Sequence, residues 1–351
     1  MNLDEIRSQI DLIDGKIIKL LNDRLSQAIM AKKFKTNIED KKREQEVFDN
    51  LERKTYDLVS PEFARRLYNI IIEESKRLQA QDLPLIAFQG EHGAYSEMAG
   101  KAWNSQLVSI PCREFAELFE GVSDGSYDYG IIPIENTLGG VVGPVNELLI
   151  TTKLHVVGAI EMPVRHCLLA VHDTDYRELR SVYSHPQALA QCKHFLARNK
   201  LDPMPYYDTA GAARMVAEKG LKGIAAIASP LAAQLYNLEI IKEQIEDLAA
   251  NTTRFLILSR EPYSGKGKKC SIIFSTAHKA GTLFRVLEIF AQAKINLTRI
   301  ESVPKSPGQY AFFLDFIGSK DDPRIEKTLQ EVEQSTSDFR LMGCYQERIL
   351  S

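Results

Sequence analysis

The chain has 351 residues, a length that predicts two or three domains rather than one core. Hydrophobic residues make up 44% and charged residues 26% of the sequence, a balance typical of water-soluble globular proteins. The formal net charge of −3 gives no general attraction to nucleic acid or anionic membrane. Any anion must therefore be bound by local groups of arginine and lysine.

Targeting signals and metal motifs are missing from the sequence. No apolar run approaches the roughly 18–20 residues of a membrane span, and the polar, acidic start Met1–Glu5 does not resemble a signal peptide. The cysteines are scattered, with no Cys-x-x-Cys pair and no Cys/His ligand spacing. We expect a cytoplasmic protein without metal or organic cofactor, whose thiols are reduced and mostly buried. These are Cys112, Cys167, Cys192, Cys270 and Cys344.

Residues 1–82 are predicted to form an all-helical domain. Apolar residues step by three and four along a first long helix: Leu3, Ile6, Ile10, Ile13, Ile17 and Leu20. A break follows near Thr36, and a second helix is predicted from about Lys41 to Leu58. Ser60 and Pro61 mark the start of a third helix, as cap and first residue. One face of that helix carries Phe63, Leu67, Ile70, Ile71 and Leu78.

Three basic residues of the first helix cannot all face one small ligand. Arg24 and Lys35 are 11 positions apart, close to three full turns, so they share a face. Arg7 and Arg24 are 17 apart, which rotates them by roughly 100° and separates them by about 25 Å. In a dimer of long crossing helices, Arg7 of one chain could reach the pocket that holds Arg24 of the other.

These charges could also be solvated residues on a bundle that only mediates interactions. Taken together, however, residues 3–80 closely resemble the all-helical chorismate mutase family. The resemblance implies a pocket built from Arg7, Arg24, Lys35, Asp40, Arg43, Glu44, Ser75 and Gln79. Chorismate is a dianion whose carboxylates suit arginine forks. Lys35 and Gln79 would donate to the breaking ether oxygen, and Asp40 or Glu44 would accept from the substrate hydroxyl.

From Leu85 the pattern changes to short apolar strands alternating with helices, which predicts an α/β domain. The expected strands are Leu85–Phe88, Tyr129–Pro133, Leu154–Ile160, Cys167–Val171, Ile224–Ala228 and Arg254–Leu258. The turn Gly90–Gly93 is a weak anion-binding signal. It lacks the lysine of a nucleotide P-loop and the spacing of a dinucleotide fingerprint, which disfavours ATP and NAD.

Five polar segments in this region, in their order, resemble prephenate dehydratase. They are Phe88–Glu97, Pro133–Gly140, Ser184–Cys192, Asp208–Ala213 and Asn251–Phe255. The resemblance covers residues 84–262 and implies two lobes similar to a periplasmic binding protein. It places the catalytic threonine at Thr253, acting through a hydrogen-bonded network that includes Glu135 as a further catalytic residue. The implied substrate-binding residues are Ser96, Asn136, Ser184, His185, Gln191, Thr209, Arg254 and Phe255.

Two points about the cleft stay open. The helix starts at Ser96 and Thr209 would hold carboxylates by backbone N–H groups, while His185 could instead be a structural donor. The segment Thr209–Ala213 also resembles plant arogenate dehydratases, so arogenate is the alternative substrate. A fused mutase that makes prephenate favours prephenate.

Residues 270–347 show the order β-α-β-β-α-β of a ferredoxin-like fold. They resemble ACT regulatory domains, and the phenylalanine-binding positions of that family correspond to Gly281, Thr282, Leu283, Glu301 and Ser302. The resemblance implies feedback inhibition by phenylalanine; the alternative is a plain dimerisation domain. The whole chain is thus expected to be a homodimeric or tetrameric enzyme of phenylalanine biosynthesis, with a non-catalytic amino-acid-binding regulator as the rival class.

Overall fold

The computed structural model describes residues 3–277, 279–306 and 309–350. It divides into a smaller helical unit, which runs to Leu85 and includes Gln106–Val108, and a larger unit that holds the remaining residues. Within the described residues, none of the helices combines the length and the apolar character needed to cross a membrane.

The helical unit contains α1 (Leu3–Lys32), α2 (Lys41–Glu52) and α3 (Pro61–Ala80). Ser60 caps α3 by accepting a hydrogen bond from the Phe63 N–H at 3.2 Å. The predicted end of the second helix near Leu58 is wrong. The helix ends at Glu52, and the backbone of Asp57 adopts a φ of 55°, in the left-handed region that an α-helix cannot contain.

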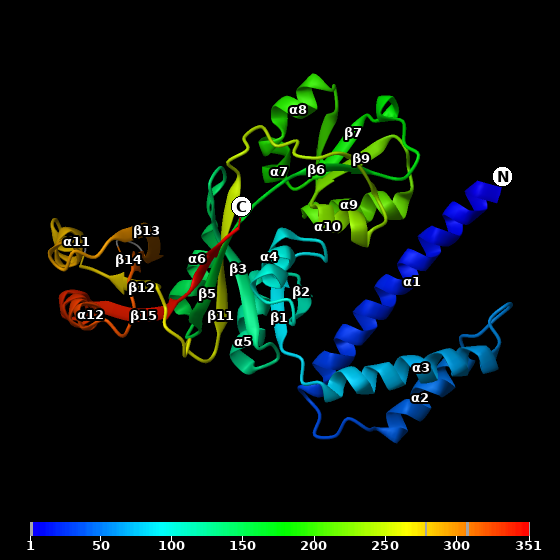
Figure 1. Cartoon of the computed structure of the whole chain (residues 1–351), viewed down its shortest axis with the longest axis horizontal. Helices are drawn as coiled ribbons and strands as arrows, with labels where there is room; N and C mark the ends of the chain where they lie inside the picture. The colour runs from blue at the N-terminus through cyan, green and yellow to red at the C-terminus, as the bar shows by residue number, and fades with distance from the viewer. Residues whose placement is uncertain (1–2, 278, 307–308, 351) are drawn as a thin grey trace. The chain divides into compact units, whose positions relative to one another are not determined.

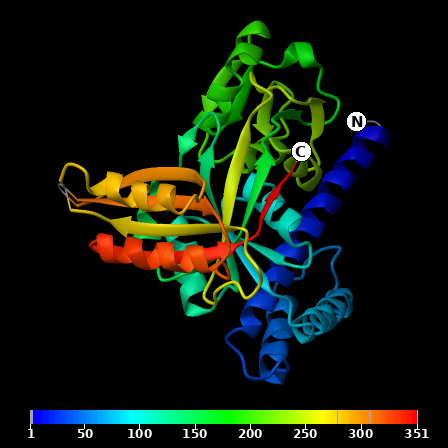
Figure 2. The same ribbon diagram turned by 60° about the vertical axis from the view of Figure 1, so that its left-hand side comes forward.

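An apolar surface of the helical unit remains exposed. The predicted stripe on α1 is exposed along its length, with 61% of Leu3, 53% of Ile13 and 64% of Leu20 accessible. On α3, Phe63, Leu67 and Ile70 are exposed as well, and the helix buries Ala64, Ile71, Ile72, Ser75 and Gln79. Figures 1 and 2 show the N-terminal half of α1 extending away from α2 and α3. We call these exposed α1 and α3 side chains the exposed apolar stripe.

The first lobe of the larger unit is built on a seven-stranded sheet. Its strand order is β16-β5-β11-β3-β1-β2, with β4 beside β3, and β11 runs antiparallel to both neighbours. Its elements are β1 (Leu85–Gln89), α4 (Tyr95–Trp103), β2 (Val108–Cys112), α5 (Phe115–Asp124), β3 (Tyr129–Asn136), β4 (Gly140–Val141), α6 (Gly143–Thr151), β5 (His155–Pro163), β11 (Thr252–Ser259) and β16 (Glu347–Ile349).

The second lobe is inserted between β5 and β11 and has a five-stranded sheet of order β10-β6-β9-β7-β8. Alanine-rich α9 packs against this sheet, with Ala210, Ala212 and Ala213 fully buried. Its elements are β6 (Cys167–Ala170), η1 (Tyr176–Glu178), β7 (Ser181–Ser184), α7 (Pro186–Gln191), α8 (Lys193–Arg198), β8 (Asp202–Pro205), α9 (Thr209–Lys219), β9 (Ile224–Ala228), α10 (Pro230–Leu235) and β10 (Glu239–Lys242).

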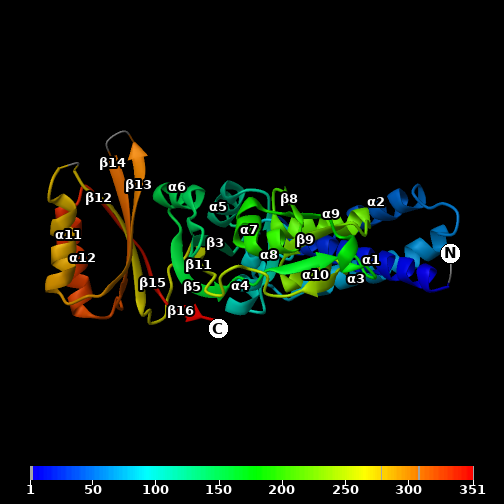
Figure 3. The same ribbon diagram turned by 90° about the horizontal axis from the view of Figure 1, so that it is seen from above.

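The C-terminal domain has the predicted β-α-β-β-α-β order and a four-stranded sheet β13-β14-β12-β15. Figure 3 shows both of its helices on the same face of that sheet. Its elements are β12 (Lys269–Ser275), α11 (Thr282–Gln292), β13 (Leu297–Ser306), β14 (Gln309–Ile317), α12 (Pro323–Ser335) and β15 (Asp338–Tyr345).

The chain then returns to the first lobe. After β15, the short strand β16 pairs in parallel with β5, with Glu347 opposite Ala159 and Ile349 opposite Glu161. In Figure 2 the last, red strand leaves the C-terminal domain and lies along the large sheet. The large sheet therefore takes its edge strand from beyond the C-terminal domain.

The expectation of five reduced cysteines is wrong for two of them. Cys270 and Cys344 are opposite one another on the neighbouring strands β12 and β15, with Cα atoms 4.1 Å apart, and form a disulfide. Strand pairing brings together two residues that are 74 positions apart in the sequence. Cys112, Cys167 and Cys192 are buried free thiols, as expected.

Candidate active sites

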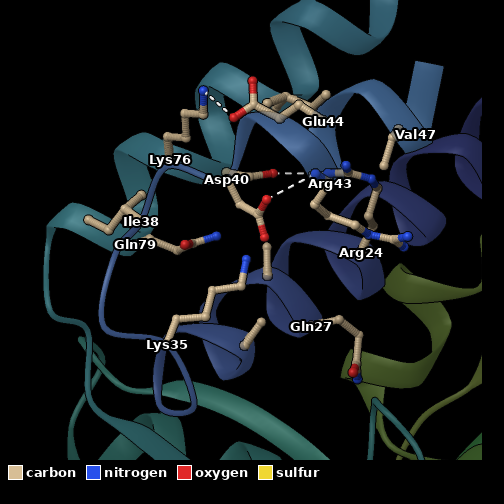
Figure 4. A pocket seen from close by; sticks show the side chains of 14 residues that line it. Arg24, Gln27, Lys35, Ile38, Asp40, Arg43, Glu44, Val47, Lys76 and Gln79 are labelled. Atoms are coloured by element: carbon tan, nitrogen blue, oxygen red, sulfur yellow. Dashed lines mark hydrogen bonds and ion pairs between the residues drawn. The ribbon is translucent and has the colours of Figure 1, made fainter. Parts of the chain in front are cut away.

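The helical unit holds a cavity of about 260 Å³ lined by all three helices and by the α1–α2 loop. Figure 4 shows Lys35 and Gln79 pointing toward the centre of this cavity, while Lys76 and Glu44 point toward each other at its edge. Seven of the eight residues predicted for this site line it: Arg24, Lys35, Asp40, Arg43, Glu44, Ser75 and Gln79. Arg7 is not among the described residues that line it.

Local hydrogen bonds fix several of these side chains. The Arg24 guanidinium donates to the Ser75 hydroxyl at 2.9 Å, which in turn donates to the backbone of α3. Asp40 caps α2 by accepting from the Arg43 N–H at 2.9 Å. Gln79 is only 6% exposed, and its side-chain oxygen has no hydrogen-bond partner among the described residues. This oxygen is an acceptor, so water or a donor group of a ligand can satisfy it, and the amide nitrogen is the atom that could donate to a ligand.

Sequence reasoning missed one charged residue of this cavity. Lys76 lines it and forms an ion pair with Glu44, at 2.7 Å between Nζ and Oε1. It follows Ser75 directly and carries no spacing signal of its own. The cavity therefore combines Arg24, Lys35 and Lys76 with the carboxylates of Asp40 and Glu44, a set suited to an anion that also bears a hydroxyl.

The second site is a cleft of about 280 Å³ to which both lobes of the larger unit contribute. Thr253 and Phe255 on β11 lie on the first-lobe side, and α7 and α9 reach it from the second lobe. Seven predicted residues line this cleft: Ser96, Asn136, His185, Gln191, Thr209, Thr253 and Phe255.

A chain of hydrogen-bonded side chains ends at Thr253. The Asn136 amide nitrogen donates to the Thr253 hydroxyl at 2.9 Å and to the Asn251 side-chain oxygen at 2.8 Å. Gln191 donates to the Asn136 oxygen at 3.2 Å. Because Asn136 supplies a hydrogen to the oxygen of Thr253, the hydroxyl hydrogen of Thr253 is left to point into the cleft.

Glu135, Ser184 and Arg254 do not line the cleft, contrary to expectation. Side chains alternate along a strand, so the neighbours of Asn136 and Thr253 point to the other face of the sheet. There the Arg254 guanidinium lies 2.6 Å from both the Asp315 and Glu347 carboxylates and 3.6 Å from that of Glu135. Ser184 is buried and donates to the backbone oxygen of Ile227 at 2.6 Å.

Arg254 therefore joins the first lobe to the C-terminal domain. Burial alone would lower its pKa, but the acidic groups of Asp315, Tyr345 and Glu347 outweigh burial and raise it. The guanidinium also donates to the Tyr345 hydroxyl at 3.1 Å. Removing any one member of this cluster would leave a buried charge uncompensated, so the contact between the two domains depends on all of its members.

The cleft is also lined by Tyr95, His166 and Asp208. Tyr95 and Asp208 lie within two of the predicted segments but were not named as site residues, and His166 lies outside all five segments. The Asp208 carboxylate caps α9 by accepting from the Gly211 N–H at 2.7 Å, so it already occupies part of the helix start expected for a substrate carboxylate. Burial raises the pKa of Asp208. Gly90, with a φ of 114°, leaves the space for it: a Cβ there would be 2.8 Å from Asp208 Oδ2.

A third cavity, of about 210 Å³, lies in the C-terminal domain. Gly281, Thr282 and Leu283 line it as expected, together with the aromatic side chains of Phe284, Tyr310 and Phe312. Glu301 and Ser302 are on β13, opposite Phe313 and Phe312, and are not among the described residues that line this cavity. The lining combines its aromatic rings with the polar side chains of Thr276, Lys279 and Thr282, a mixture that suits an amino acid with a hydrophobic side chain.

Comparison with known proteins assigns the same three regions. The chain matches family models described as chorismate mutase type II over residues 6–80, prephenate dehydratase over 86–263 and ACT domain over 271–334. A bifunctional chorismate mutase/prephenate dehydratase of Aquifex aeolicus is 33% identical over 362 residues, which cover 99% of this chain and 99% of that protein.

Two further relatives each match about three quarters of the chain. Arogenate dehydratase/prephenate dehydratase 2, chloroplastic, of Arabidopsis thaliana is 41% identical over 274 residues, covering 74% of this chain and 72% of that protein. The crystal structure of a prephenate dehydratase in complex with L-Phe from Arthrobacter aurescens is 27% identical, with a TM-score of 0.70. It covers 75% of this chain and 89% of that chain.

Proposed function

Because the chain belongs to the family of bifunctional chorismate mutase/prephenate dehydratases, we propose that it catalyses two consecutive steps of phenylalanine biosynthesis. The helical cavity rearranges chorismate to prephenate. The two-lobed cleft converts prephenate to phenylpyruvate, and the cavity of the C-terminal domain binds phenylalanine as a feedback inhibitor. No cofactor is required for either step.

In the helical cavity, the rearrangement needs binding and charge stabilisation but no covalent step. Arg24 and Arg43 would hold the carboxylates, while Lys35 and Gln79 donate to the ether oxygen as negative charge grows on it. Each such donor is worth roughly 3 kcal/mol in a site that excludes water. Glu44 would accept from the substrate hydroxyl.

In the cleft, the Thr253 hydroxyl would give a proton to the leaving hydroxyl of prephenate. That hydroxyl departs as water while the ring carboxylate leaves as carbon dioxide, and the electron pair of the broken C–C bond completes the aromatic ring. Thr253 is a weak acid, so the amide chain through Asn136 and Gln191 is needed to orient it.

The observation that carries the proposal is the presence, in one chain, of a cavity that gathers Arg24, Lys35 and Gln79 and a cleft that presents Thr253. A coupled assay that follows chorismate loss and phenylpyruvate formation tests it. Arg24→Ala should abolish chorismate loss but keep phenylpyruvate formation from added prephenate. Thr253→Ala should keep chorismate loss and abolish phenylpyruvate formation. Wild-type protein that leaves chorismate unchanged would refute the proposal.

Arogenate is the second candidate substrate of the cleft, because the Arabidopsis relative carries both activities in its name. Arogenate differs from prephenate by an amino group on the side chain. Direct competition between the two substrates, measured as the ratio of their kcat/KM values, decides between them. We expect the ratio to favour prephenate, which the helical cavity would supply.

We also propose that two chains complete each helical cavity. The exposed apolar stripe on α1 and α3 needs a partner of matching length, and a second copy of the same helices would bury it. Such a dimer would bring Arg7 of one chain to the cavity of the other. When Arg7→Ala and Arg24→Ala chains are coexpressed, each mixed dimer should contain one intact cavity out of two. Because about half of the dimers are mixed, about a quarter of the wild-type mutase activity should return. Two inactive parents that stay inactive when mixed would contradict the shared cavity.

The proposed location is the cytoplasm. Cys112, Cys167 and Cys192 are free thiols, as in proteins of a reducing compartment, whereas the Cys270–Cys344 disulfide is a bond that such a compartment disfavours. Cell fractionation followed by the coupled assay tests this location, and activity confined to an oxidising compartment would contradict it.

A further inference from the structure

The cleft is short of positive charge. Among the described residues that line it, none is a lysine or an arginine, and Arg254 points to the other face of the sheet. The proposed substrate nevertheless carries two carboxylates. Only two of the lining side chains can become cations, His166 and His185, and they differ in environment: His166 is 2% exposed, whereas His185 is exposed.

The hydrogen-bond chain fixes which nitrogen of His166 carries a hydrogen. The backbone N–H groups of Leu138 and Gly139 donate to the side-chain oxygen of Asn136, at 3.0 and 2.6 Å. Gln191 must therefore turn its nitrogen toward that oxygen and its own oxygen toward His166 Nε2, which is 2.8 Å away. Because that oxygen can only accept, Nε2 of His166 holds the hydrogen in every protonation state.

The other ring nitrogen faces Tyr95. The Tyr95 hydroxyl is 2.9 Å from His166 Nδ1 and 2.8 Å from the backbone oxygen of Arg165. Burial raises the pKa of Tyr95, so the hydroxyl keeps its single hydrogen and can serve only one of these two acceptors when His166 is neutral. A proton on Nδ1 satisfies both contacts, because the ring then donates to Tyr95 and Tyr95 donates to Arg165.

The other groups around His166 have opposite effects on the pKa of its imidazole. Burial lowers the pKa of its imidazole, while the Glu246 carboxylate, which accepts from the His166 backbone N–H at 2.8 Å, favours the charged form. The thiols of Cys167 and Cys192 lie near the Tyr95 ring, and Asp208 lies elsewhere in the cleft. In the empty cleft burial prevails. An entering carboxylate adds the negative charge that reverses this balance.

We propose that His166 takes up a proton on Nδ1 when the anionic substrate enters the cleft, and so supplies the positive charge that the cleft otherwise lacks. The inference rests on the proposed function, because it takes a dicarboxylate as the ligand. The proton comes from solvent, and no bond of the substrate changes in this step. Tyr95 assists by accepting the new N–H. His166 thus acts as a counter-charge for binding, beside the hydroxyl chemistry of Thr253.

Calorimetry on a Thr253→Ala protein that also carries Arg24→Ala tests the proposal directly, since prephenate, the product of the helical cavity, should then bind only in the cleft and should not be consumed. Titrations near pH 7.5 in buffers of different ionisation enthalpy should show uptake of about one proton. In the wild type, kcat/KM for prephenate should fall by about tenfold per pH unit above the pKa of the empty enzyme.

The decisive variant is His166→Gln, made in both backgrounds. Glutamine keeps an N–H donor near the Nε2 position but cannot take up a proton. We expect proton uptake to vanish, the pH slope of kcat/KM to flatten and the affinity for prephenate at pH 7 to fall by about tenfold. Denaturant unfolding reports that the larger unit, which holds His166, is folded. Uptake that persists in this variant would overturn the proposal.

His185→Gln is the matched control. The Nδ1 atom of His185 accepts from the Gln187 N–H at 3.3 Å, and its ring is exposed, so it lacks the buried setting described above. The pH slope should persist in this variant, and its loss would assign the counter-charge to His185 instead. The two proposals fail in different ways. No binding heat with prephenate would contradict the proposed function of the cleft, whereas binding without proton uptake would contradict only the role of His166.

Discussion

The guanidinium of Arg254 lies 2.6 Å from the Asp315 carboxylate, although one belongs to the first lobe and the other to the C-terminal domain. Thr253, the preceding residue on β11, faces the cleft on the opposite side of the sheet. One strand therefore presents the proposed proton donor to the substrate and an anchoring charge to the C-terminal domain. A movement of the C-terminal domain would be transmitted from Arg254 to Thr253 through the one peptide bond that joins them.

Removing the Arg254 charge should destabilise the larger unit. Arg254→Gln leaves the buried Asp315 carboxylate without its partner, a change that typically costs about 3–5 kcal/mol. Denaturant unfolding measures the loss. The control is Arg324→Gln, which removes an arginine whose ion pair with Asp322 is exposed, and it should leave the unfolding midpoint unchanged. Equal midpoints for both variants would show that the buried cluster adds no stability.

Acid should weaken the same cluster. Burial raises the pKa of Glu347, but Arg254 and Lys269 outweigh burial and lower it. A lowered pKa stabilises the folded chain above the pKa of an unfolded glutamate, about 4.3, and this stability is lost as the pH falls through the folded value. Glu347→Gln should therefore be less stable than wild type at pH 7, and the difference should shrink below about pH 4. A difference that grows in acid would contradict the sign of the shift.

The mutase activity should be independent of pH across the neutral range, because Gln79 is a neutral donor at every pH. Gln79→Glu makes the donor titratable. At pH 7 the carboxylate repels the growing charge on the ether oxygen, so kcat should fall by at least about 100-fold and recover as the pH is lowered. Steady-state rates between pH 5 and 8 measure this. A wild-type rate that itself rises steeply below pH 6 would argue against this role for Gln79.

The role of Thr253 is tested by comparing serine and alanine at the same position. Thr253→Ser keeps the hydroxyl that accepts from Asn136, so it should retain much of the dehydratase kcat. Thr253→Ala should lose about 100- to 10,000-fold, the usual contribution of a positioned proton donor. Mutase activity serves as the internal control. If both variants lose activity equally, the methyl group rather than the hydroxyl matters.

Phenylalanine sensing is tested at the glycine turn of the third cavity. Gly281 has a φ of 86°, a backbone conformation that is strained for any residue with a Cβ. A Cβ added at Gly281 would meet no neighbouring atom within 4 Å, so the strain would come from the backbone alone. Gly281→Ala should raise the phenylalanine concentration for half-inhibition of the dehydratase by about tenfold. Gly220→Ala imposes comparable strain at an exposed helix end, with a φ of 62°, and should leave that concentration unchanged. Equal shifts in both variants would point to general strain.

The sequence predicts local features well because they depend on neighbouring residues. The start of α3 follows from Ser60 and Pro61. Arg24 and Lys35 both line the helical cavity as expected, but the predicted helical spacing is wrong: α1 ends at Lys32, and Lys35 reaches the cavity from the loop that follows. The apolar stripe on α1 was also predicted, but its role was not, since periodicity does not tell whether a helix face is covered by the same chain.

The sequence could not predict to which face of the sheet the side chains of a strand point. Glu135 and Arg254 are next to Asn136 and Thr253 in the motifs, yet the period of two sends them to the C-terminal domain. His166 stands alone before a buried strand, and only the folded chain brings it to Tyr95 and Gln191. No local pattern marks such a residue.

The edge strand β16 makes the order of synthesis matter. Residues 347–349 emerge from the ribosome after the C-terminal domain, yet they pair with β5 in the sheet that carries Thr253. A nascent chain that stops within the C-terminal domain would lack both this strand and the Glu347 anchor. We therefore expect a nonsense mutation there to lower dehydratase activity as well as to remove the proposed regulation.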